Sequence, residues 1–146
     1  MEAVKLSEEL LKFISESPSM FHSVKTISKY LDEAGYKYLL EQEVWKLEKG
    51  GKYYTTRNGS SVIAFKIGDD LVDYHFQITA AHGDSPTYKV KSVSELYGAG
   101  KYIKLNIEAY GGMIDSTWFD KPLSVAGRVL IKEENKTVSK LLYIDK

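Results

Sequence analysis

The spacing of apolar residues changes once along the chain, near Gly35, and this change limits the folds open to it. Before that point apolar residues recur every three or four positions, in two groups separated by Ser-Glu-Ser-Pro at 15–18. This spacing predicts two amphipathic helices, the second capped by Ser17 or Ser19 and ended by Ala34-Gly35. The apolar stripes are Leu6, Leu10, Phe13 and Ile14, then Phe21, Val24, Ile27, Tyr30 and Leu31.

After Gly35 the apolar residues alternate with polar ones, which is typical of β-strands. Residues 52–68 predict two strands joined at Asn58-Gly59, the strongest short hairpin signal in the chain. Residues 71–81 end in an apolar run, which predicts a long strand buried at the centre of a covered sheet. The segments 87–93, 102–112, 124–134 and 139–146 also have strand character. The fold class is therefore mixed α/β.

The composition excludes several classes of protein. Hydrophobic residues make up 43% and charged residues 27%, the balance of a folded globular chain. The 20 basic and 20 acidic residues give no net charge, and no basic tract suggests a nucleic-acid partner. The chain has no cysteine, no signal peptide and no apolar run long enough for a membrane span, so we expect a cytoplasmic location and no membrane partner.

One short motif contains residue types that could bind a metal ion. His82 and Asp84 follow the predicted strand 71–81, at the end where open α/β sheets place their sites. A neutral imidazole binds zinc well through one ring nitrogen. When the other ring nitrogen donates a hydrogen bond to a carboxylate, that bond fixes the tautomer of the imidazole. Gly83 between them could adopt backbone angles that other residues resist. A polar turn in which Asp84 caps local amides is the alternative, and spacing alone favours it.

The other two histidines do not complete a site by sequence. A catalytic zinc ion needs at least three protein ligands. His75 lies seven residues before His82 on the same predicted strand, too far away to share a metal. His22 belongs to the second predicted helix, where a packing role is the simpler interpretation. Trp118 and Phe119 similarly suit core or interface packing, and Asp115 and Asp120 have no histidine near them.

Three blocks together resemble the aspartyl aminopeptidase and vacuolar aminopeptidase I family of dinuclear zinc metallopeptidases. They are SPSMFHSV at 17–24, AAHGDSPTYKVK at 80–91 and YGGMIDSTWFDKPLSVAGRV at 110–129. Three positions depart from the family pattern: Met20 where proline is expected, Gly83 where threonine is more usual, and Lys121 in place of arginine. None of them is the histidine of the second block.

The resemblance implies an aminopeptidase that removes amino-terminal residues from peptides. Its active site would hold two zinc ions, which cobalt or manganese could replace. His82 would bind one zinc ion, and Asp84 would support that histidine and count as catalytic. The remaining ligands and the general-base glutamate would lie later in the family's sequence, so we expect this chain alone to be inactive. The expected partners are peptide substrates with a free amino terminus and further copies of the chain.

The resemblance also implies how the chain is organised. Residues 1–92 would form the first part of a zinc-exopeptidase α/β/α sheet domain. Residues 93–146 would begin a β-rich domain inserted into it, which mediates subunit contacts in the family. A chain truncated in this way could instead act as a non-catalytic oligomerisation or interaction module, because exposed strand edges favour association.

Overall fold

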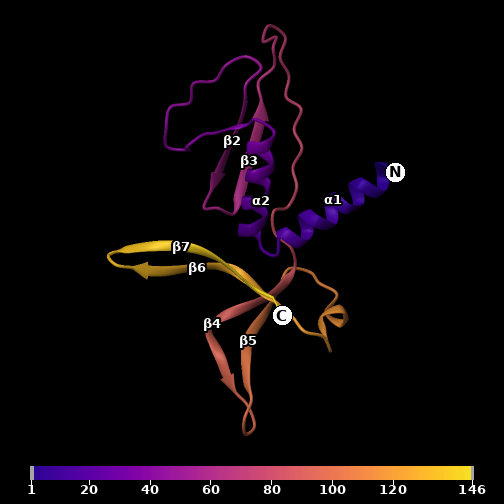
Figure 1. The fold of residues 1–146 in the computed structure, drawn as a ribbon, viewed down its shortest axis with the longest axis vertical. Helices are drawn as coiled ribbons and strands as arrows, with labels where there is room; N and C mark the ends of the chain where they lie inside the picture. Colours follow the sequence, from indigo (N-terminus) through magenta and orange to yellow (C-terminus); the bar gives the residue numbers. More distant parts are fainter. Residues whose placement is uncertain (1, 146) are drawn as a thin grey trace. The chain divides into compact units, whose positions relative to one another are not determined.

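The computed structural model describes residues 2–145, and these divide into two compact units. One unit contains the residues up to 84 together with 124–145, and the other contains 85–123. The elements are α1 (Glu2–Glu16), α2 (Met20–Glu33), β1 (Lys37–Tyr38), β2 (Lys52–Arg57), β3 (Ser61–Lys66), β4 (Thr87–Tyr97), β5 (Ile103–Tyr110), the 3-10 helix η1 (Asp115–Trp118), β6 (Val125–Glu133) and β7 (Lys136–Ile144) (Figure 1). The mixed α/β fold class is thus confirmed.

The two helices begin and end where the sequence predicts. Ser19 is the residue before α2, but its hydroxyl contacts His22 Nδ1 at 2.8 Å instead of capping a backbone amide. After α2, Gly35 adopts φ +78°. The amides of Gly35 and Tyr36 donate to the carbonyls of Asp32 and Leu31, which is the Schellman arrangement that a left-handed glycine permits. No helix within residues 2–145 is both long and apolar enough to cross a membrane.

The first unit contains a three-stranded sheet of order β1-β2-β3, with β1 parallel and β3 antiparallel to β2. The β2–β3 turn has positive φ at both central residues, 55° at Asn58 and 64° at Gly59. The amide of Ser60 donates to the carbonyl of Arg57 at 3.1 Å. This is the turn type that Asn-Gly favours, so the predicted hairpin is confirmed.

The core of this unit lies between α2 and β2 (Figure 1). Val24 on α2 and Tyr54 on β2 are at most 5% exposed, whereas Tyr53, also buried, lies on the opposite face of β2, where its ring packs on Phe65. The Tyr54 hydroxyl donates to Asp32 Oδ1 at 2.7 Å, so the polar end of the buried ring has a partner on α2. Burial, followed by the hydrogen bond and charge of Asp32, raises the pKa of Tyr54 to about 12.

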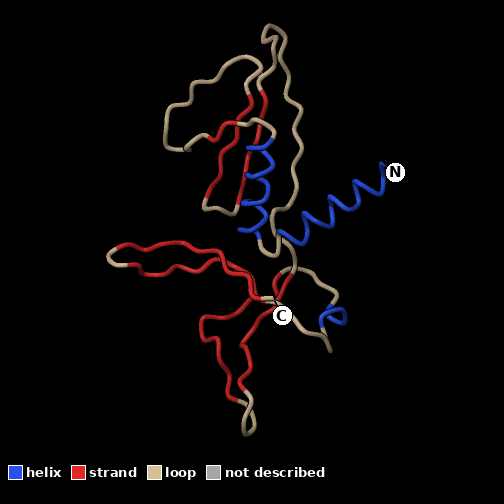
Figure 2. Tube along the Cα trace, viewed as in Figure 1, coloured by secondary structure: helices blue, strands red, loops and turns tan. Residues whose placement is uncertain are grey.

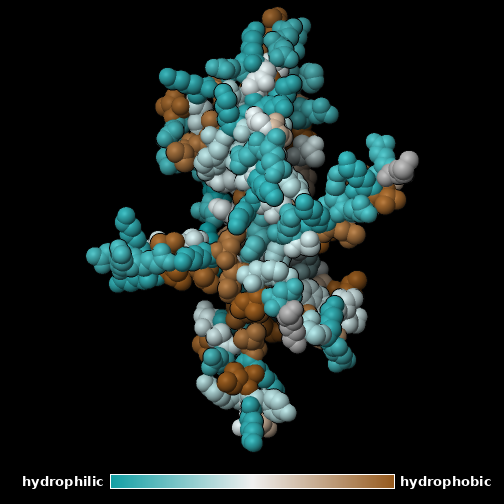
Figure 3. Space-filling model, viewed as in Figure 1, coloured by the Kyte–Doolittle hydropathy of each residue, from teal (hydrophilic) through white to brown (hydrophobic). Residues whose placement is uncertain are grey.

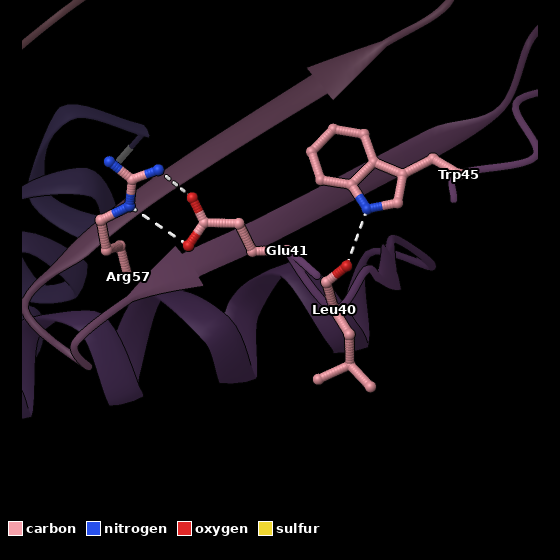
Figure 4. A network of polar contacts seen from close by, with 4 residues as sticks. All are labelled: Leu40, Glu41, Trp45 and Arg57. Carbon is pink, nitrogen blue, oxygen red and sulfur yellow. Dashed lines mark hydrogen bonds and ion pairs between the residues drawn. The ribbon is translucent and has the colours of Figure 1, made fainter. Parts of the chain in front are cut away.

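The loop between β1 and β2 is joined to β2 by an ion pair and contains one internal hydrogen bond, both shown in Figure 4. Arg57 at the end of β2 forms an ion pair with Glu41, and Trp45 Nε1 donates to the carbonyl of Leu40 at 2.8 Å. The Trp45 ring also stacks on Phe65 of β3, with centroids 6.1 Å apart. The loop is therefore held against the sheet by packing as well as by polar contacts.

The hairpin β6–β7 belongs to the first unit, where β6 contacts α2. The second unit contains the hairpin β4–β5, whose register shifts between Val90 and Glu95, and η1. Within that unit the ring of Trp118 meets Tyr88 edge-on at 5.4 Å. Apolar side chains are exposed on each hairpin (Figure 3), including Val93, Tyr97 and Tyr102 on β4–β5 and Leu130 on β6.

The predicted strand at 71–81 is wrong for this structure. These residues form a loop that leads from β3 to β4 (Figure 2), with Phe76 81% and Ile78 82% exposed. A buried strand needs a hydrogen-bonded neighbour on each side. No strand within residues 2–145 pairs with this segment, so it does not form a strand despite its apolar sequence.

Candidate metal centre

The His82–Asp84 motif forms a side-chain pair in the structure. His82 Nδ1 lies 3.3 Å from Asp84 Oδ1, within hydrogen-bonding distance. The His82 side chain is 94% exposed, whereas that of Asp84 is 33% exposed. An ionised carboxylate only accepts hydrogen bonds, so this contact selects the tautomer that carries its proton on Nδ1. The lone pair of Nε2 is then available to a ligand on the solvent side.

The backbone between the two residues lies against the β2–β3 turn. A Cβ atom added at Gly83 would lie 3.7 Å from the carbonyl oxygen of Ser60, an ordinary van der Waals distance. Gly83 does not adopt a positive φ. The expectation that this position exploits glycine's backbone freedom is therefore wrong. A residue with a β-carbon, such as threonine, would fit its β-carbon here.

The other histidines lie in different surroundings. His22 is half-buried on α2, where Nδ1 contacts the Ser19 hydroxyl and the ring meets Tyr143 of β7 edge-on at 6.4 Å. Desolvation, and then the charge of Lys25, lower the pKa of His22, which favours the neutral ring at neutral pH. His75 is exposed on the loop 71–81. Within residues 2–145, neither histidine forms a group of three possible metal ligands with His82 and Asp84.

The chemistry of the donors fits part of a zinc site. An exposed imidazole oriented by a carboxylate is the arrangement of a zinc-binding histidine and its supporting group. Within residues 2–145, however, no group of three or more histidine, cysteine, aspartate or glutamate side chains could hold a metal ion. His82 and Asp84 alone therefore supply one ligand and its support, fewer than the three ligands of a catalytic zinc site.

Asp115 and the aromatic residues of the third block have structural contacts instead. Asp115 Oδ1 accepts a hydrogen bond from the Tyr88 hydroxyl at 3.3 Å. Desolvation, with the charge and hydrogen bond of Asp115, raises the pKa of Tyr88. Trp118 packs on the same tyrosine, while Phe119 is 60% exposed. These contacts tie η1 to β4 inside the second unit.

Comparison with known proteins shows the family to which the chain belongs. The sequence model described as Aminopeptidase I zinc metalloprotease (M18) matches residues 13–146. The chain belongs to the M18 family. Among curated M18 proteins, the probable M18 family aminopeptidase 2 of Clostridium novyi (strain NT) is 50% identical over 133 residues. The match covers 90% of this chain and 31% of that protein, so the chain spans about a third of its relative's length.

Solved structures of M18 relatives share the fold. Ape4, in its cryo-EM complex with Nbr1, superposes with a TM-score of 0.89 at 39% identity, covering 94% of this chain and 27% of that one. The S. cerevisiae mApe1 dodecamer superposes with a TM-score of 0.80 at 29% identity, covering 98% of this chain and 34% of that one. The resemblance carried by the three sequence blocks is thus confirmed. The roles of His82 and Asp84 stay predictions.

Sequence reasoning assigned no role to Arg128, although the residue lies within the third block. Its Cζ atom lies 4.2 Å from the centroid of the Phe21 ring, and Nη1 donates to the carbonyl of Asn58 at 2.5 Å. One guanidinium therefore contacts the first block and the β2–β3 turn. Its place in the third block was the one sequence signal for Arg128. Residue spacing does not link Arg128 to residues as distant in sequence as Phe21 and Asn58.

Proposed function

We propose that the protein containing this chain is a zinc-dependent aminopeptidase, in which His82 binds zinc and Asp84 orients His82. The observation that carries the proposal is the 3.3 Å contact between His82 Nδ1 and Asp84 Oδ1 beneath an exposed imidazole. Membership of a family described as zinc metalloproteases supplies the reaction class. We propose two zinc ions per site, which cobalt or manganese could replace, and peptides with a free amino terminus as substrates.

The chain's own residues would act before and during metal binding. Asp84 accepts a hydrogen bond from the Nδ1–H group of His82, which restrains rotation of the ring and keeps the Nε2 lone pair directed outward. The carboxylate also raises the basicity of the ligand nitrogen. Bound zinc supplies a Lewis acid that polarises the scissile carbonyl of the peptide. We propose no general base within this chain.

The test is hydrolysis of aminoacyl chromogenic substrates by the native gene product. The expected result is turnover that a chelator abolishes and that added zinc or cobalt restores. Turnover that is insensitive to chelators would contradict zinc dependence, and no turnover on any aminoacyl substrate would contradict the reaction class. Substrates with acidic, leucine-like and other amino-terminal residues are compared, so that the assay also gives the preferred residue.

We further propose that residues 1–146 alone, expressed as a separate polypeptide, are inactive. Residues 2–145 bring no three metal-binding side chains together, whereas a catalytic zinc needs at least three. Chelator-sensitive turnover by the isolated polypeptide would contradict this. The proposed division into a peptidase part at 1–92 and an inserted part at 93–146, like the cytoplasmic location, stays a prediction.

A second proposed property is self-association. The hairpin β4–β5 exposes large apolar side chains, with Tyr97 79%, Tyr102 74% and Val93 72% exposed. A lone two-stranded hairpin is marginally stable in water, and such a surface is typical of an interface. The solved mApe1 relative is a dodecamer, which supports a homo-oligomer here. Light scattering coupled to size exclusion tests this, and a monomer at micromolar concentration would contradict it.

A further inference from the structure

The three sequence blocks that mark the family come together around one turn of the first unit. The turn is Asn58-Gly59-Ser60, between β2 and β3. Arg128 of the third block donates to the carbonyl of Asn58 in the turn. Gly83 of the second block lies near the turn, because a β-carbon added there would be 3.7 Å from the carbonyl oxygen of Ser60. Phe21 of the first block lies under the same guanidinium. The His82–Asp84 pair is thus connected to α2 and β6 through three turn residues.

Arg128 is held from two directions. Its guanidinium plane contacts the face of Phe21 on α2, where the cation is attracted to the ring, and Nη1 donates to Asn58. Both central residues of the turn have positive φ, so the turn has one well-defined geometry. A charged donor on a backbone carbonyl is a stronger anchor than a neutral one.

The position of the turn matters to the metal ligand because the Ser60 carbonyl lies close to the backbone at Gly83. Residues 71–81 before it lie in no strand, and the His82 side chain is almost fully exposed. The Ser60 carbonyl beside Gly83 is a packing surface for the backbone that joins His82 to Asp84. If the turn shifts, this backbone loses that surface, and the 3.3 Å contact that orients His82 loosens.

We infer that Arg128 is a positioning residue for the zinc ligand His82, acting through the Asn58-Gly59-Ser60 turn. This inference rests on the proposed function, because it assumes that His82 binds zinc. The contacts of Arg128 that carry the inference are those to Phe21 and to the carbonyl of Asn58, so its effect is on where the turn, and with it the loop, lies. Removing the guanidinium should therefore weaken zinc binding, with a smaller effect than removing the ligand itself.

The test compares zinc affinity by competition with a chelating indicator in the native gene product and four variants. Arg128→Met keeps the length of the side chain but removes the charge and the donor. Lys132→Met removes a charge from an exposed position on the same strand and is the matched control. His82→Ala removes the ligand, and His75→Ala controls for a nearby exposed histidine.

We expect Arg128→Met to weaken zinc binding about threefold to tenfold. Loss of a residue that directly supports a metal ligand usually lowers metal affinity by about tenfold or more. Lys132→Met and His75→Ala should leave the affinity unchanged, and His82→Ala should lower it most. If Arg128→Met matches the unsubstituted protein while His82→Ala does not, the positioning role is refuted and the proposed function stands. If His82→Ala has no effect, the proposed function itself fails.

A rescue experiment separates positioning from a general loss of stability. A shallow groove of about 390 Å³ lies beside Arg128, lined by α2, the β2–β3 turn and β7. Added guanidinium can therefore reach the space left in Arg128→Ala. We expect guanidinium at low millimolar concentration to restore zinc affinity to Arg128→Ala, whereas the same concentration of sodium should not. Equal affinities with both salts would contradict the assignment, because a merely destabilised protein has no specific need for the planar cation.

Discussion

The Cζ atom of Arg128 on β6 lies 4.2 Å from the centroid of the Phe21 ring on α2. This contact joins the hairpin β6–β7 to the helix that packs on β2, within one compact unit. The same guanidinium donates to the carbonyl of Asn58, so one side chain connects a helix, a turn and a hairpin. The Ser60 carbonyl at the end of that turn would lie 3.7 Å from a β-carbon added at Gly83, the residue between His82 and Asp84.

The Arg128–Phe21 contact should contribute measurably to stability. Phe21→Leu keeps an apolar side chain but removes the aromatic face, and we expect a loss of about 1 to 2 kcal/mol in the free energy of unfolding. Arg128→Met should cost a similar amount. Urea unfolding of both single variants and the double variant gives the coupling energy. We expect about 0.5 to 1 kcal/mol of coupling, and strictly additive losses would show that the ring and the cation do not interact.

Burial of Tyr54, together with its hydrogen bond to Asp32, should make stability depend on pH in the alkaline range. The pKa of Tyr54 is raised from its usual 10 to about 12 in the folded protein, so the folded state holds the proton more tightly than the unfolded state. The stabilisation is therefore complete below pH 10 and is lost as the pH rises through 12. Tyr54→Phe should cost about 1 to 2 kcal/mol at pH 7.

The measurement is urea unfolding of both proteins at several pH values between 7 and 12. Tyrosines and lysines common to both proteins titrate in each, so the difference between the two stabilities isolates Tyr54. We expect that difference to shrink above pH 10. A constant difference across the range would mean that the hydroxyl titrates alike in the folded and unfolded states.

The β2–β3 turn should tolerate little change at Gly59. A residue with a β-carbon is strained at φ 64°, so Gly59→Val should destabilise the protein by about 1 to 2 kcal/mol. Gly112→Ala is the control, because Gly112 has no positive φ and a β-carbon there meets no atom within 4 Å. Thermal unfolding of both variants checks this. Equal melting temperatures would contradict the account of the turn.

Local signals in the sequence predicted the local elements well. The two amphipathic stripes, Gly35 and Asn58-Gly59 each specify a backbone geometry through neighbouring residues, and the structure has α1, α2 and the β2–β3 hairpin there. The later segments with alternating residues also form strands, β4 to β7. In these cases the apolar pattern and the turn residues are close in sequence, so no distant partner is needed to interpret them.

Features that depend on distant partners could not be predicted. Residues 71–81 have the composition of a buried strand, but a strand forms only against neighbours, and none within residues 2–145 pairs with them. The contact between Arg128 and Phe21 likewise depends on how β6 packs on α2. At the site, spacing alone favoured a polar turn, whereas the family resemblance implied that Asp84 supports His82, and the two side chains meet at 3.3 Å. Neither gave any indication that the Ser60 carbonyl lies beside Gly83.

The central claim is that His82 binds zinc, and the most direct measurement is the zinc content of the purified native gene product. Zinc is determined by mass spectrometry after dialysis against metal-free buffer, for the unsubstituted protein, His82→Ala and His75→Ala. We predict that His82→Ala loses at least one zinc ion per chain while His75→Ala retains the full amount. Equal zinc in all three proteins would contradict the claim.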